Sequence, residues 1–199
     1  ATRRGIWPPA DNRSAYLSLG ASPVVLALAA WTLVLNVDYS GSAGGWPYIP
    51  LLNPLDLGQM FVLATLAFWV LEQTRAKGLL FTVLGGLTFA WASAGAARAV
   101  HHWLGVPFHW DRLFDSVALQ ASWSILWALL ALGMMIHATR SGLRTLWFAG
   151  FGLLGVVGLK LMLVDTAHVN TLGRTVSLLG VALLVIAASY FSPTPPKKS

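Results

Sequence analysis

Six long apolar stretches, almost free of charge, constrain this chain more than any other feature of its sequence. Most approach the length of about 20 residues that an α-helix needs to cross the hydrocarbon core of a bilayer. They cover residues 17–37, 57–71, 78–97, 116–136, 146–164 and 175–191. In hydrocarbon only helices and closed barrels satisfy their own backbone, and these stretches are too uniformly apolar for barrel strands. We therefore predict an all-α integral membrane bundle of about six transmembrane helices.

Little of the chain remains for regions outside the membrane. We expect a cytoplasmic segment at residues 1–16, a membrane domain at residues 17–191 and a cytoplasmic tail at residues 192–199. Only 10% of the residues are charged, whereas about 25% is usual in soluble domains. The sequence thus leaves no room for a separate soluble domain. The chain opens on Ala1 rather than Met, which suggests a fragment, a processed product or a trimmed chain.

The net charge and the absence of cysteine exclude several kinds of partner and of chemistry. The net charge is +6, but the basic residues are scattered at the ends of apolar segments. This pattern is typical of membrane topology and argues against nucleic-acid binding. The chain has no cysteine, which excludes disulfides, thiolate metal sites and cysteine nucleophiles.

The distribution of lysine and arginine predicts the orientation. Nine of them lie in the N-terminal segment, the second–third loop, the fourth–fifth loop and the tail, and three lie on the opposite side. Because cytoplasmic loops carry the excess of Lys and Arg, we expect both termini in the cytoplasm. The outer side then holds most of the acidic residues and the two longest loops.

Local signals mark helix starts and contacts. Asn53 and Pro54 are typical of a helix N-terminus, and Asp56 suits the positive end of the helix dipole. Small residues spaced by four or three predict close helix contacts in the third and fifth spans. They are Gly86, Ala90, Ala94, Gly152, Gly155 and Gly158. Four tryptophans lie deep in the spans, where they fill a core or contact lipid, pigment or a partner. They are Trp31, Trp91, Trp123 and Trp127.

Two segments resemble a known family. The run Trp46–Asp56, with its Pro-Leu-Leu-Asn-Pro-Leu-Asp core, and the run Gly158–Asp165 followed by Arg174 carry the likeness. They resemble the domain of unknown function 2339 family of very large bacterial membrane proteins, a resemblance that implies a location in the inner membrane of a bacterial cell. The resemblance spans about residues 17–191 and implies that this chain is a C-terminal piece of such a protein or a short relative. It implies no activity, cofactor or catalytic residue.

Polar residues gather where the third span leaves the membrane on the outer side. Arg98, His101 and His102 share one helix face if the helix continues that far. His109 and Asp111 follow in the same loop.

A second group of polar residues lies on the last hairpin. Lys160 falls about 21 Å along the fifth helix from Leu146, at a rise of about 1.5 Å per residue, and so lies in the outer leaflet. An intramembrane cation is a candidate functional residue. Lys160 could instead pair with Asp56, Asp115 or Asp165 to set helix register, or extend to the interface. Asp165 and Arg174 flank a short loop and are placed to pair across the hairpin.

The spacing of the histidines gives little support for a metal site or a haem. The histidines match no helical metal motif, and we expect no metal site. A bis-histidine haem between His137 and His101 or His102 fails because these residues lie at opposite ends of their helices, roughly 30 Å apart. A single histidine that ligates a pigment such as chlorophyll stays open, and the cofactor is otherwise unknown.

The leading hypothesis is a non-enzymatic structural or accessory subunit that packs against other membrane proteins. An alternative is an envelope-facing enzyme or a protein that handles lipid or glycan. Its candidate site residues are His101, His102, His109, Asp111, Lys160, Asp165 and Arg174. A second alternative is a transporter component. Neither a serine-nucleophile elbow nor a phosphate-binding loop is present in the sequence.

Overall fold

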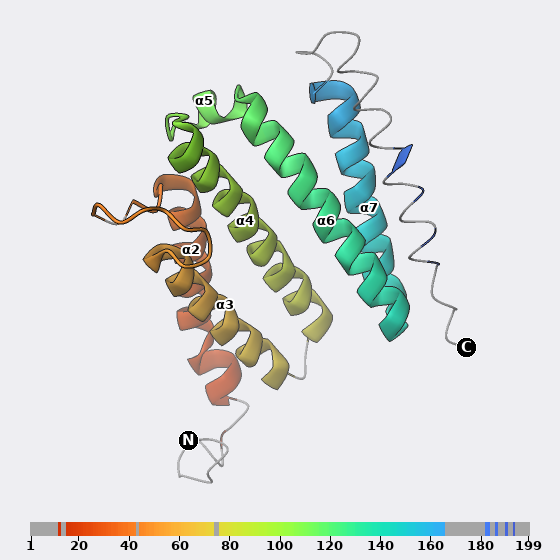
Figure 1. Ribbon diagram of the computed structural model, residues 1–199. Helices are drawn as coiled ribbons and strands as arrows, with labels where there is room; N and C mark the ends of the chain where they lie inside the picture. Colours follow the sequence, from red (N-terminus) through yellow and green to blue (C-terminus); the bar gives the residue numbers. More distant parts are fainter. Residues whose placement is uncertain are drawn as a thin grey trace. The chain divides into compact units, whose positions relative to one another are not determined.

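The computed structural model describes Asn12 and residues 15–42, 44–73 and 76–165, together with the single positions 182, 183, 186, 190 and 193. Every element in these residues is helical, which confirms the predicted all-α fold. The chain divides into two compact units (Figure 1): unit 1 comprises residues 1–108 and unit 2 comprises residues 109–199. Each unit has a hydrophobic cluster of its own.

Unit 1 is built from three long helices. A π-helical turn, η2 (Tyr16–Gly20), leads into α2 (Ser22–Asp38), and α3 (Pro54–Glu72) and α4 (Lys77–Leu104) follow. Most of the packing joins α4 to α2 and α3. Helix α4 continues beyond residue 97, where its apolar run was predicted to end, to Leu104. There Gly105 stops the helix by adopting a left-handed conformation with φ of +69°.

The apolar core of unit 1 lies in the middle of its helices. Its buried members are Val62, Leu63 and Leu66 of α3 and Leu87 of α4. Aliphatic side chains of α2 and α4 and the ring of Trp91 pack against them. This deep tryptophan therefore serves the core of its own unit.

Unit 2 contains a helical hairpin preceded by one short helix. The elements are α5 (Trp110–Phe114), α6 (Val117–Ser141), α7 (Arg144–Lys160) and a final π-helical turn, η3 (Leu161–Asp165). Helices α6 and α7 pack along each other. The buried residues between them are Ala131, Met135, Ala138, Trp147 and Leu154.

A glycine other than the predicted ones allows α7 to approach α6 closely. A Cβ atom added at Gly150 would lie 2.8 Å from Met135 Cγ and 2.9 Å from the carbonyl oxygen of Ala131. At Gly152 or Gly155 it would meet no described atom within 4 Å. With 3.6 residues per turn, Gly150 lies on the buried stripe that includes Trp147, and the other two glycines do not. The predicted seam at Gly152 and Gly155 is therefore not the contact with α6.

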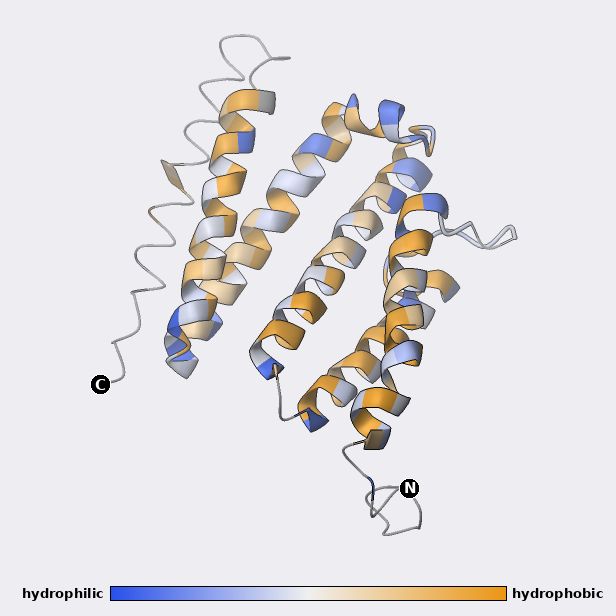
Figure 2. Ribbon diagram, turned by 180° about the vertical axis from the view of Figure 1, so that it is seen from behind, coloured by the Kyte–Doolittle hydropathy of each residue, from blue (hydrophilic) through white to orange (hydrophobic). Residues whose placement is uncertain are grey.

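Five helical segments of the described residues are long and apolar enough to cross a membrane. They are Tyr16–Asp38, Pro54–Glu72, Lys77–Leu104, Val117–Ser141 and Arg144–Leu163. They match the first five predicted spans. Figure 2 shows apolar residues predominating along these helices and hydrophilic residues near several of their ends. The predicted sixth span, residues 175–191, lies outside the described residues except at four isolated positions.

The tight contact at Gly150 predicts a difference between two glycine-to-alanine variants of α7. Gly150→Ala should lower the free energy of unfolding by about 1–3 kcal/mol, because the new methyl group overpacks the contact with α6. Gly152→Ala should leave stability unchanged or raise it slightly, because alanine is the better helix former. Thermal unfolding of the purified protein in detergent micelles measures both. Equal effects of the two variants would contradict this account of the α6–α7 contact.

Candidate functional site

The strongest concentration of buried polar groups in unit 1 lies where the loop between α2 and α3 meets the C-terminal part of α4. The start of α3 establishes it. Asn53 caps this helix, since its Oδ1 accepts a hydrogen bond from the amide of Leu55 at 2.9 Å, and Pro54 occupies the first helical turn. The Asn53 side chain also donates through Nδ2 to the carbonyl of Gly41 at 2.6 Å. The predicted cap is confirmed, and it ties the loop to the helix.

Asp56, in the first turn of α3, forms an ion pair with Arg98 of α4. Arg98 Nη2 lies 2.7 Å from Asp56 Oδ1, and the two side chains are 0% and 2% exposed. Arg98 also donates through Nη1 to Asn36 Oδ1 of α2 at 3.2 Å. The pair therefore joins all three helices of unit 1. Removing two charges from water costs several kcal/mol each, so such a pair persists only with good geometry and additional hydrogen bonds.

The loop supplies those additional bonds to the carboxylate. Tyr48 donates its hydroxyl to Asp56 Oδ2 at 3.1 Å, and the amide of Leu51 donates to the same oxygen at 3.3 Å. Both oxygens of the carboxylate are thus engaged. Burial, and next the charge of the nearby Asp56, raise the pKa of the Tyr48 phenol to about 12. The phenol stays protonated and continues to donate.

A glycine lets the loop lie against the ion pair. Gly41 has φ of +75°, which favours glycine. A Cβ atom there would lie 3.1 Å from Arg98 Cδ and 3.3 Å from Tyr48 Cε2. The backbone at this position therefore covers the aliphatic part of the arginine directly.

His101 and His102 hold the same region together. His102 Nε2 lies 2.7 Å from the carbonyl oxygen of Ser40, and its ring stacks on Tyr48 at 4.6 Å between centroids. His101 Nδ1 lies 2.6 Å from the carbonyl oxygen of Val106. Because a carbonyl only accepts, each of these ring nitrogens carries a proton. Trp103 adds a bond from Nε1 to the carbonyl of Tyr48 at 3.1 Å.

The continuation of α4 confirms that Arg98, His101 and His102 lie on one helix, yet their environments differ. Arg98 is fully buried against Asp56, whereas the two histidines are half-buried and bind backbone carbonyls. From the sequence, Asp56 is expected to be a favourable charge at a helix start or a partner of Lys160, and its pair with Arg98 was not predicted. The signal that could have revealed it is an acid and an arginine at the borders of neighbouring apolar spans, where charges need partners.

The other candidate residues belong to unit 2. His109 precedes α5 and Asp111 lies within it, and both are exposed. Lys160, half-buried at the end of α7, donates through Nζ to the carbonyl of Gln120 and to Ser124 Oγ, each at 2.9 Å. These contacts bind the lysine to α6, while the carboxylate of Asp56, one of its suggested partners, is bound to Arg98.

The predicted pair of Asp165 and Arg174 lies beyond what can be described. Arg174 is outside the described residues, and for Asp165 only the backbone is described. Among the side chains that the structure does describe, no three of the metal-ligating types His, Cys, Asp and Glu lie together as ligands of one ion would.

The helical architecture and the five apolar spans define a polytopic membrane protein of the all-α class. Over residues 2–195 the sequence matches the family described as "Predicted membrane protein (DUF2339)", and the chain belongs to this family. The resemblance inferred from the loop and hairpin motifs is thereby confirmed. Comparison with curated proteins and with solved structures gives no match.

The buried ion pair predicts strong coupling between two substitutions. Asp56→Leu and Arg98→Met should each lower the free energy of unfolding by about 3–5 kcal/mol, because each leaves one buried charge without its partner. The double variant should lose much less than the sum of the two. A double-mutant cycle from thermal unfolding in micelles measures the coupling. Asp111→Asn, at an exposed position, is the control and should change little. Additive losses at positions 56 and 98 would contradict the pairing.

The raised pKa of Tyr48 predicts a loss of stability in alkali. The unfolded chain releases the phenolic proton near pH 10, whereas the folded protein retains it to about pH 12. Stability from this group is therefore complete below pH 10 and falls between about pH 10 and 12. Unfolding midpoints across this range should fall less steeply in Tyr48→Phe than in the unaltered protein. Tyr39→Phe, at an exposed position, should retain the original slope, and identical slopes for all three proteins would refute the prediction.

Proposed function

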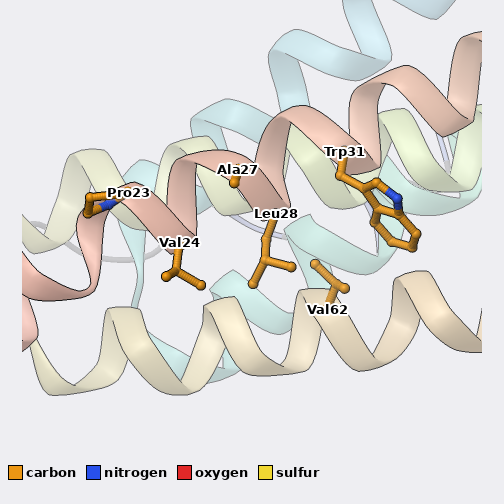
Figure 3. Close-up of a pocket in the computed structure, with 6 residues that line it drawn as sticks. All are labelled: Pro23, Val24, Ala27, Leu28, Trp31 and Val62. Atoms are coloured by element: carbon orange, nitrogen blue, oxygen red, sulfur yellow. The ribbon is translucent and has the colours of Figure 1, made fainter.

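We propose that this chain is a non-enzymatic structural or accessory subunit that packs against helices of other membrane proteins. The observation that carries the proposal is an apolar groove on the surface of unit 1. Helix α2 forms most of its wall through Pro23, Val24, Ala27, Leu28 and Trp31, and Val62 of α3 completes it (Figure 3). Its volume is about 560 Å³.

Much of the apolar surface of α2 is not covered by the other described helices of unit 1. Only 6% of the residues in its most apolar window are buried within the chain. Trp31, which lies in the middle of the membrane span, is 43% exposed at the groove. The sequence placed this tryptophan among the deep ones that fill a core or contact lipid, pigment or a partner. Its exposure in a groove favours an external contact.

The alternation of large and small side chains along the groove suits the packing of a second helix. Ala27 lies one turn from Pro23 and one turn from Trp31 on the same face of α2. A small residue between larger ones forms a hollow into which a second helix can pack. In a bilayer, lipid tails are as apolar as leucine, so helices associate through close van der Waals packing at such small residues. The hollow at Ala27 therefore favours a packed protein helix over loosely ordered lipid as the occupant of the groove.

The polar residues support the non-enzymatic part of the proposal. The side chains of His101, His102 and Lys160 each bond to the backbone or side chains of neighbouring segments in their own unit. Such bonds hold loops and helices in place. They engage the groups that a catalytic mechanism would require to be available to a substrate.

The proposal includes a location and an orientation. The location is the inner membrane. Lysine and arginine are in excess where α3 is joined to α4 and where α6 is joined to α7, which supports an orientation with both termini in the cytoplasm. In that orientation the ion pair of Asp56 and Arg98 lies near the outer surface, and the groove extends from the start of α2 to its middle.

Photo-crosslinking in native membranes tests the proposal. A benzophenone amino acid at Val24, in the groove, should give a discrete crosslinked protein. The same amino acid at Val83, an exposed valine of α4, should give a much weaker product. Ala27→Leu should fill the hollow and reduce crosslinking from Val24 by about tenfold or more, since a disrupted interface core typically costs over 1.4 kcal/mol.

Ala64→Leu is the matched control for Ala27→Leu, because Ala64 is exposed on α3 and does not line the groove. It should leave the crosslink unchanged. Recovery of only lipid adducts from Val24, together with purification of the chain as a free monomer from native membranes, would refute the proposed subunit role.

A further inference from the structure

Several polar atoms in the interior of unit 1 have no protein partner in the part of the chain that the structure describes. They are Nδ2 of Asn36, both amide atoms of Gln59, Nε of Arg98 and the indole nitrogen of Trp91. Gln59 is the extreme case, since its side chain is 0% exposed and neither end of its amide is bonded. A buried polar group left unsatisfied costs about 1–3 kcal/mol, so native proteins rarely tolerate one.

Three of these residues belong to one layer between the helices. Gln59 lies one turn beyond Asp56 on α3, and neighbours at this spacing are about 5–6 Å apart at Cβ. Arg98 binds Asp56, and Asn36 binds Arg98. The residues that carry these unbonded atoms therefore belong to the ion pair, bind it directly or lie one helical turn from it, and each comes from a different helix.

Their burial restricts what can satisfy them. Asn36, Gln59 and Arg98 are all buried within unit 1, so neither a lipid headgroup nor a side chain of a partner protein can reach them without unfolding the unit. Only a molecule small enough to occupy the interior can do so.

The hydrogen-bonding properties of these groups determine which small molecule can bind between them. Asn36 Nδ2 and Arg98 Nε can only donate, whereas the Gln59 amide offers both a donor and an acceptor. The guest must therefore accept and donate hydrogen bonds. It must also be neutral, because the charge of Arg98 is already balanced by Asp56 and an added ion would be buried without a counter-ion. Water fulfils all three conditions, and buried waters typically make about three such bonds.

We propose that unit 1 binds water within this layer, between Asn36, Gln59 and Arg98. The bound water completes the hydrogen bonding of the ion pair and links α2, α3 and α4 through a single small molecule. The polar interior of the unit is then a hydrated site inside a helical membrane domain, covered on one side by the loop that carries Gly41 and Tyr48.

Nuclear magnetic resonance on the full chain in micelles tests the proposal directly. The sequence has only three glutamines, at positions 59, 73 and 120, so labelling with side-chain ¹⁵N-glutamine gives three amide signals. The signal lost in Gln59→Met identifies Gln59. In a water-selective rotating-frame Overhauser experiment, dipolar contact and proton exchange give cross-peaks of opposite sign.

A dipolar cross-peak between water and the Gln59 amide protons is the expected result. The internal comparison is Gln73, whose Nε2 donates to the carbonyls of Trp69 and Leu17 at 3.3 and 3.4 Å. Absence of a dipolar cross-peak at Gln59 would overturn the proposal. This measurement uses the unaltered protein and does not depend on whether any variant folds.

The stability of Gln59→Met provides a second test through its sign. If water satisfies the amide, the substitution discards real hydrogen bonds and should lower the unfolding temperature by several degrees. If the amide is truly unpaired, its removal relieves a penalty and should raise the unfolding temperature, which would overturn the proposal. Leu63→Met, in the apolar core one turn further along α3, controls for packing. An unfolding temperature that rises with chloride but not with gluconate, and no longer does so in Gln59→Met, would also overturn it, since the guest would then be an anion.

Discussion

Unit 1 depends on how two charges are accommodated away from water. Asp56 and Arg98 lie at the borders of apolar helices and are almost completely buried. In such surroundings an unpaired charge would cost about 3–5 kcal/mol, a large part of the roughly 5–15 kcal/mol by which a domain is stable. The pair therefore requires hydrogen bonds from several neighbouring groups. Asn36 of α2 binds Arg98, and in the loop Tyr48 and the amide of Leu51 bind Asp56. Gly41 has no side chain, so the loop can approach the pair closely.

This requirement makes the outer loop part of the folded core. Tyr48 is buried, stacks on His102 and accepts a bond from Trp103 through its carbonyl. Asn53 serves two purposes, as the cap of α3 and as a donor to Gly41. Residues that would suggest surface chemistry in isolation are thus positioned to enclose an ion pair.

Unit 2 satisfies its membrane-embedded cation differently. Lys160 has a compact ammonium group that donates to the Gln120 carbonyl and the Ser124 hydroxyl of α6, whereas Arg98 uses its planar fork for a carboxylate and an amide. The α6–α7 contact itself rests on small residues, with Gly150 directly against the backbone of Ala131. Membership of the DUF2339 family brings no activity to either unit. The proposed role as a subunit that packs against another helix rests instead on the groove along α2.

The sequence by itself determined the helical class, five spans that the structure contains, the cap at Asn53 and the family. These follow from local rules, because a bilayer demands about 20 apolar residues per helix and a cap involves residues adjacent in the chain. Only the tertiary structure decided that Asp56 pairs with Arg98, that Gly150 rather than Gly152 meets α6, and that Trp31 faces outward while Trp91 packs inward. Partners 42 residues apart and the rotation of each helix depend on how the helices pack, and an amphipathic pattern that would reveal the rotation is absent when both lipid and core are apolar.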